Sequence, residues 1–351
     1  MPTHRHDLVA HARIAQACSW ACPQIEVIIR DNSGNAQKRE LIARFQSDHC
    51  RIVSVDPCDP MTNMREVIHL AKGDFVFLIA DDDACFDHAI KALPGVIDEF
   101  GGDSSVVGVT GGYAIETSKR TSVGGYEGVN ADDLATRLTG YLKYPGPNIL
   151  FYSPLRRQVV QRAFDLITAM PLQFSFHDQL LSLIYLLSGK FVQLQRLIYC
   201  YDMGPWENKE TAQQRDLEFY NASKLDPAIN KLHWLLCAFE GAVLIAHPQV
   251  VPSYSAAQRQ QAADLWFAAL FGRLQHDNRD GYDSPFNEDA DRLVAKWRAA
   301  NGAITFDNIL TDIRAFVALG SPDGARRYFD YWRAMLDKRD PLALQPVAAS
   351  A

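Results

Sequence analysis

The feature that most constrains this chain is an apolar run at residues 75–79, which leads through one alanine into three consecutive aspartates. Five apolar residues without polar alternation are typical of a strand that is buried on both faces of a parallel sheet. We therefore place Asp81, Asp82 and Asp83 at the carboxyl end of a central strand. Open α/β sheets bind their ligands at such ends.

Three adjacent carboxylates repel one another, and burying them without a cation is costly. A hard divalent ion, Mg²⁺ or Mn²⁺, relieves this conflict because it binds carboxylate oxygen and can bridge to a diphosphate. A solvated acidic loop before the next predicted helix, residues 87–97, accounts for the same three residues without a ligand. The run alone leaves both interpretations open, and its place directly after a buried strand favours the metal site.

Strands and helices alternate through the first half of the chain, which predicts a doubly wound α/β fold. Further strand candidates and helical spacings share short connections, so we expect a mostly parallel sheet. The strand candidates are residues 25–29, 51–55, 106–110 and 191–199, and the helical spacings are 38–46, 64–71, 87–97, 155–170 and 178–187. Residues 117–147 are rich in glycine and polar side chains and predict an irregular excursion with a short helix near 131–142.

The pattern changes at about residue 205, where long amphipathic spacings begin. They predict five helices at 228–246, 256–274, 290–300, 306–319 and 324–336. We therefore expect a sheet-containing domain over 1–204, a helical C-terminal region over 205–340 and a flexible tail over 341–351.

Charge and cysteine content exclude several classes of protein. The formal net charge is −7, whereas nucleic-acid binding needs a basic surface. The seven cysteines are scattered and odd in number, which indicates free thiols in a reducing compartment rather than a disulfide framework. No signal sequence is evident, and the longest apolar stretches are too short or, at Glu240, interrupted for a transmembrane segment. These features predict a cytoplasmic protein, and peripheral membrane contact through a lipid-linked acceptor stays open.

Two further aspartates are candidates for a ligand site. Asp31 follows the predicted strand 25–29 and could accept the imide N–H of a uracil or thymine ring, although an Asx turn explains it equally well. Asp178 opens the predicted helix 178–187. As an N-terminal acid it can stabilise the helix dipole, which is the commoner role, or it can serve as a general base in a cleft.

Several motifs occur in the order and spacing of family-two nucleotide-sugar glycosyltransferases, which have the GT-A fold, and the chain resembles them over residues 1–202. The motifs are Pro2-Thr3-His4-Arg5, residues 25–33 ending in Asp31-Asn32-Ser33, Asn63 followed by Ala71-Lys72-Gly73-Asp74, the acidic run 81–83, His177-Asp178-Gln179-Leu180, Gly189-Lys190-Phe191-Val192 and Tyr199-Cys200-Tyr201.

The resemblance implies roles for individual residues. Thr3, Arg5 and Asn63 would line the donor site, with Asp31 on the base and Asp81 or Asp82 on the ribose. Asp83 would hold the metal, and Asp178 would be the catalytic base of an inverting transfer. His177 replaces the glutamate that usually precedes this aspartate. We take it, with Trp206 after the last strand, as an acceptor-side candidate, although simple packing is the commoner role of such an aromatic residue.

One departure from the family concerns the first strand. The family has an apolar strand ahead of its Pro-Thr motif, between the second strand and the strand that bears the acidic run, and this sequence begins at Met1-Pro2-Thr3. We therefore expect residues 25–29 and 75–79 to be either splayed apart or bridged by another segment.

The leading hypothesis is a metal-dependent inverting glycosyltransferase that uses a nucleoside diphospho-sugar, UDP favoured, and a glycan or lipid-linked acceptor in polysaccharide or glycan assembly. One alternative is a catalytically inactive nucleotide-sugar-binding or scaffold protein. The other is a metal-dependent nucleotidyltransferase, but such enzymes usually carry a Gly-rich basic loop after the first strand, and we find none in this sequence.

Overall fold

The computed structural model describes residues 1–143, 148–277, 279, 282–300 and 305–339, so the tail predicted for 341–351 lies outside it. The chain forms two compact units. The first comprises Met1–Asp132, Tyr144–Phe164 and Ser188–Glu207, and the second comprises Asp133–Lys143, Asp165–Leu187 and Asn208–Ala351. The division therefore does not follow a single boundary near residue 205, because two earlier segments group with the C-terminal helices.

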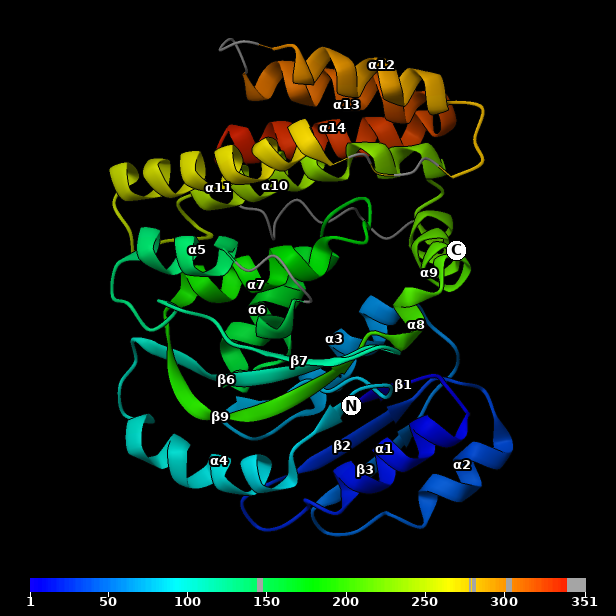
Figure 1. Cartoon of the computed structure of the whole chain (residues 1–351), viewed down its shortest axis with the longest axis vertical. Coiled ribbons are helices and arrows are strands. Elements are labelled where there is room, and N and C mark those ends of the chain that lie inside the picture. Colours follow the sequence, from blue (N-terminus) through cyan, green and yellow to red (C-terminus); the bar gives the residue numbers. More distant parts are fainter. Residues whose placement is uncertain (144–147, 278, 280–281, 301–304, 340–351) are drawn as a thin grey trace. The chain divides into compact units, whose positions relative to one another are not determined.

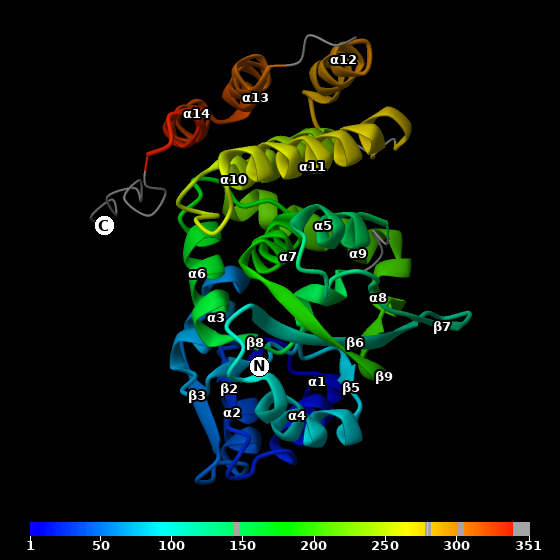
Figure 2. The ribbon, with the colours of Figure 1, turned by 90° about the vertical axis from the view of Figure 1, so that its left-hand side faces the viewer.

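The first unit contains a parallel sheet in the order β1-β2-β3. Its strands are β1 (Pro2–Thr3), β2 (Val27–Asp31) and β3 (Cys50–Ser54), and its helices are α1 (Leu8–Cys18), α2 (Ala36–Ala43) and α3 (Pro60–Leu70). Figures 1 and 2 show α1 and α2 on one face of this sheet and α3 on the other. Right-handed crossovers place successive helices in this way when the strand order runs outward and then reverses.

The second sheet of this unit is mixed rather than mostly parallel. Its order is β4-β8-β6-β9-β5, with β7 paired to β6, and of its pairs only β6 with β9 is parallel among the described residues. The strands are β4 (Phe75–Val76), β5 (Ala84–Cys85), β6 (Val106–Glu116), β7 (Thr121–Gly124), β8 (Leu155–Arg156) and β9 (Lys190–Asp202), and α4 (Asp87–Phe100) lies between β5 and β6. The strand β7 occupies part of the stretch predicted to be irregular.

Residues 75–79 behave differently from a normal central strand. Only Phe75 and Val76 are paired, with β8, and residues 77–79 lie outside any strand. They belong to a different sheet from β2, so the expectation that 25–29 and 75–79 are not directly paired is confirmed.

The second unit is helical. Its helices are α5 (Leu134–Lys143), α9 (Lys209–Ala222), α10 (His233–Ala246), α11 (Ala256–His276), α12 (Asn287–Arg298), α13 (Phe306–Gly320) and α14 (Pro322–Leu336), with a 3₁₀ turn at Pro227–Leu232. Most of α6 (Arg157–Thr168) belongs to the first unit, and most of α7 (His177–Ser188) to the second. The five predicted C-terminal helices are confirmed, and α9 was not predicted because it lacks a clear apolar face.

One stretch, Pro227–Ala246, is long and apolar enough to cross a membrane by length and composition alone. However, 94% of its most apolar window is buried within the structure. Glu240 in its middle accepts a hydrogen bond from Tyr328 (2.8 Å) and is itself buried. This is the environment of a core helix in a folded helical layer.

Close packing of α10 on α11 depends on Gly241, and this gives a testable prediction. A Cβ atom at this position would overlap the indole nitrogen of Trp266, which donates to the carbonyl of Cys237 (3.0 Å). We expect Gly241→Ala to lower the free energy of unfolding by about 1–3 kcal/mol, because overpacking displaces this ring. Urea unfolding of the full chain measures the effect.

The matched control is Gly272→Ala in α11, where a Cβ atom would meet open space. It should raise stability by about 0.5–1 kcal/mol, the helix-propensity gain of alanine over glycine. Equal effects of the two substitutions would contradict the packing role of Gly241.

Candidate active site

The three aspartates of the acidic run contact different partners within the first unit. Asp81 is buried, and its Oδ2 accepts from the Thr3 hydroxyl (2.5 Å) and from the Arg5 backbone N–H (3.3 Å). Asp82 is half-buried and forms an ion pair with the Arg5 guanidinium (3.2 Å). The loop after β1 is therefore bound to two of the three carboxylates.

Asp83 is held by the end of β9. Because Ala84 pairs with Cys200 across β5 and β9, Asp83 lies opposite the last residues of that strand. Its Oδ2 accepts from the Tyr199 hydroxyl (2.6 Å) and its Oδ1 from the Asp202 backbone N–H (2.9 Å). Burial, and then the charge of Asp82, raise the pKa of Asp83 to about 7. A cation at this carboxylate would favour its ionised form.

A buried polar chain connects Asp31 to Asp81. The β1–β2 register sets Thr3 beside Asp31, and α2 places Lys38 over both. The Lys38 ammonium contacts Asp31 Oδ1 (2.8 Å) and donates to the Thr3 hydroxyl (2.8 Å), which donates in turn to Asp81. All four side chains are at most 5% exposed.

Asp31 is thus fully enclosed in this arrangement. Its carboxylate also accepts from the backbone N–H and the hydroxyl of Ser33 (3.2 Å each), which is the predicted Asx turn. Direct contact with a nucleobase requires a change at Lys38 or at the turn, since no surface of Asp31 is open.

Asn63 in α3 is also satisfied internally. Its amide donates to the side-chain oxygen of Asn32 (3.0 Å) and accepts from the Arg30 guanidinium. The Asn32 amide in turn donates to the Cys58 carbonyl (2.8 Å). Asn63 therefore helps to fix the loop that follows β2.

Among the described residues, no group of three or more His, Cys, Asp or Glu side chains forms a metal cage. Magnesium often needs only one or two carboxylates together with substrate phosphates. Asp83 fits such a site because a carboxylate has about four acceptor positions and two are used here. The run is therefore compatible with a metal that a diphosphate helps to hold.

Asp178 and His177 belong to the second unit, at the start of α7. Asp178 Oδ1 accepts from the backbone N–H of Gln179 (2.7 Å), as expected for an acid in the first turn of a helix. The His177 ring is buried, with Nδ1 3.0 Å from the Gln173 side-chain oxygen and Nε2 3.6 Å from Glu240. These contacts assign His177 to the packing of α7 against α10.

The structure thus brings together Thr3, Arg5, Asp31, Asp81 and Asp82, with Asp83 next in sequence. Trp206 lies in α8 (Gly204–Glu207), and its side chain is outside the described part of the chain. Lys38 and Asp202 were not candidates from the sequence. Asp202 could have been found from its place shortly after the strand predicted for 191–199, but nothing local marks Lys38.

No family model and no curated protein sequence matches the chain. Solved structures of TarS from S. aureus are similar in fold. TarS 1-349 in complex with UDP-GlcNAc aligns with a TM-score of 0.50 and 12% identity over 98% of this chain and 87% of that one. A second TarS structure gives a TM-score of 0.52 and 12% identity, and the chain spans 53% of its length. The expected α/β fold with an added helical region is confirmed.

Proposed function

We propose that this protein is a glycosyltransferase that moves a sugar from a nucleoside diphosphate donor, with UDP favoured, to an acceptor hydroxyl. The likeness in fold to TarS, which has been solved with UDP-GlcNAc, supports a nucleotide-sugar donor. The observation that carries the proposal is the acidic run Asp81–Asp83, which follows residues 75–79 and is bound to β1 through Thr3 and to the loop after β1 through Arg5.

The proposed transfer is metal-dependent and proceeds with inversion. Asp83 would hold Mn²⁺ or Mg²⁺, whose charge would stabilise the departing diphosphate. Arg5 and Asp82 would orient the ribose side of the donor, and Asp178 would remove the proton of the acceptor hydroxyl. We propose a glycan or lipid-linked acceptor and a cytoplasmic site of action, consistent with the charge and the free thiols.

The second candidate function is a nucleotide-sugar-binding protein without turnover. The enclosure of Asp31 by Lys38 favours it, because this carboxylate is implied to hold the base. Binding and turnover measured with the same donors, the UDP-, GDP-, dTDP- and CDP-sugars with Mn²⁺, separate the two candidates.

A metal ligand at Asp83 has a measurable consequence. Asp83→Ala should abolish the rise in melting temperature that UDP and Mn²⁺ produce together, which corresponds to about 2.7 kcal/mol at a hundred times the dissociation constant. The variant Asp83→Asn removes the charge with little change of shape, and its single amide oxygen can keep one of the two accepted hydrogen bonds, the one from the Asp202 N–H. Differential scanning fluorimetry measures both.

The control is Asp48→Ala, which removes an exposed carboxylate of the same unit. It should respond to UDP and Mn²⁺ like the unaltered protein. A full response of Asp83→Asn and Asp83→Ala would rule out Asp83 as the ligand, whereas a response to UDP without Mn²⁺ in all variants would show metal-free binding.

A further inference from the structure

Two cysteines from different elements of the first unit lie against each other. Cys18 is the last residue of α1 and Cys50 is the first residue of β3, and their sulfur atoms are 3.3 Å apart. The two residues are 32 positions apart in the chain. The fold therefore creates this thiol pair, and no local sequence motif marks it.

The backbone on both sides of the pair is held in place. Ser19, directly after Cys18, caps α1 through its N–H. Cys50 pairs with Val27 of β2, and its N–H donates to the Ser47 hydroxyl (3.1 Å). A disulfide has a sulfur–sulfur bond of about 2 Å, so the two sulfur atoms need to approach by roughly 1 Å. Small rotations of two side chains cover such a distance.

The contact makes one of the two thiols more acidic than the other. The hydrogen bond between the sulfur atoms lowers the pKa of Cys50 and raises that of Cys18, because it stabilises the thiolate of the first and the thiol of the second. The thiolate is the nucleophilic form of cysteine. A thiol of lowered pKa beside a second thiol is the arrangement found in redox-sensitive cysteine pairs.

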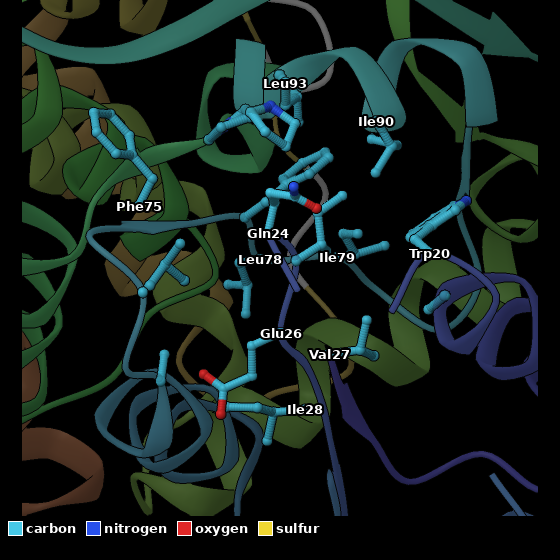
Figure 3. A pocket seen from close by; sticks show the side chains of 18 of the residues that line it. Trp20, Gln24, Glu26, Val27, Ile28, Phe75, Leu78, Ile79, Ile90 and Leu93 are labelled. Atoms are coloured by element: carbon cyan, nitrogen blue, oxygen red, sulfur yellow. The ribbon is translucent and has the colours of Figure 1, made fainter. Parts of the chain in front are cut away.

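A cavity of about 350 Å³ lies next to the pair (Figure 3). Its lining includes Trp20, Gln24 and Val27, which Figure 3 labels. Trp20 is close to Cys18 in the sequence, and Val27 is the strand partner of Cys50. The cavity can hold several molecules of the size of water, and hydrogen peroxide is little larger. Cys50 is only 2% exposed, so a small oxidant has access that a bulky one lacks.

We propose that Cys18 and Cys50 form a reversible disulfide when the protein meets hydrogen peroxide. The Cys50 thiolate attacks one peroxide oxygen and the O–O bond breaks, which leaves a sulfenic acid and a hydroxide that takes up the proton lost by Cys50. The Cys18 sulfur then attacks the Cys50 sulfur, the S–O bond breaks, and a second water leaves with the Cys18 proton. The two thiols lose two electrons, and one peroxide becomes two waters.

The disulfide would close a loop that contains β2 and α2, and with them the buried pair of Asp31 and Lys38. Cross-linking restricts the unfolded chain and so stabilises the folded one. A thiol reductant reverses the bond by exchange. The inference needs only the fold of the first unit and is independent of the proposed sugar transfer.

The test treats the full chain with hydrogen peroxide, blocks the remaining thiols with iodoacetamide and maps the unreduced peptides by mass spectrometry. We expect a peptide pair that joins Cys18 to Cys50 and separates after dithiothreitol. The melting temperature should rise by about 4 °C or more, because a disulfide that closes a loop of this length stabilises substantially. Reduction should return it to the original value.

The variant Cys18→Ser removes the partly exposed member of the pair and should give neither the cross-link nor the rise. The matched control is Cys22→Ser, which removes a second partly exposed thiol just after α1, with its sulfur 3.5 Å from the Gln24 side-chain oxygen. This control should respond like the unaltered protein. An equal rise in Cys18→Ser, a link from Cys22 in place of Cys18, or no link in the unaltered chain would overturn the inference.

Discussion

The variant Asp178→Asn is expected to lose turnover by a factor of about 10²–10⁴, the usual contribution of a general base, while donor binding and stability change little. An ionised carboxylate can take the proton of an attacking hydroxyl, and an amide cannot. Product formation with UDP-GlcNAc and a range of acceptors measures the rate, and fluorimetry with the same donor measures binding.

The local structure makes this substitution a clean test. Asp178 Oδ1 accepts from the Gln179 backbone N–H (2.7 Å), and an asparagine oxygen can accept the same bond. The control is Asp226→Asn in the same unit, where the side chain likewise caps a helical turn by accepting from the Ala228 N–H (2.9 Å). Asparagine caps as well as aspartate, so this control should keep full turnover.

Near-normal turnover in Asp178→Asn would remove Asp178 from the proposed mechanism. A parallel loss in Asp226→Asn would show that the effect is structural. Loss of donor binding in Asp178→Asn, with a matching loss of rate, would instead indicate a binding role.

Sequence patterns predicted those parts of the fold that depend on local information. The helix from Pro60 to Leu70 begins after a capping aspartate, Asp59, whose side chain accepts from the Thr62 N–H. The amphipathic spacings after residue 205 predicted five helices because each must bury one face. The acidic run was expected at the end of a central strand, and this was wrong: it follows residues 75–79, of which only Phe75 and Val76 form a strand, at one edge of the second sheet.

Features that depend on distant partners could not be predicted. The run 75–79 has the composition of a complete strand, but only Phe75 and Val76 pair, with β8, because the length of a strand depends on the partner beside it and not on its own composition alone. Similarly, α5 and most of α7 group with the C-terminal helices through tertiary contacts that leave no local pattern. From the sequence, His177 was an acceptor-side candidate beside Asp178. In the structure its Nε2 lies 3.6 Å from the carboxylate of Glu240, which is more than sixty positions away in the chain.

Lys38 is the clearest case of missing local information. It lies in α2, within the helical spacing predicted for residues 38–46, and a lysine on such a helix would normally be exposed. Its burial follows from two acceptors on other strands, Asp31 on β2 and Thr3 on β1. A buried charge is tolerated only when it is paired, so the sequence pattern of α2 alone cannot reveal it.

The variant Lys38→Met is expected to lower the free energy of unfolding by about 3–5 kcal/mol, because it leaves the Asp31 carboxylate buried without its cation. The control Lys91→Ala removes an exposed lysine on α4 and should change stability by no more than about 0.5 kcal/mol. Urea unfolding, followed by circular dichroism, measures both.

The double variant Lys38→Met with Asp31→Asn decides whether the ion pair itself is responsible. Removing both charges leaves no uncompensated group, so the double variant should be more stable than either single one, with a coupling energy of about 1–3 kcal/mol. Additive losses would show that Lys38 acts through its contact with Thr3 alone. The chain of contacts from Lys38 runs through Thr3 and ends at Asp81. Neither the single nor the double variant is therefore expected to alter the hydrogen bond between Tyr199 and Asp83. The response to UDP with Mn²⁺ then distinguishes a role of the Lys38–Asp31 pair in the donor site from a role confined to folding.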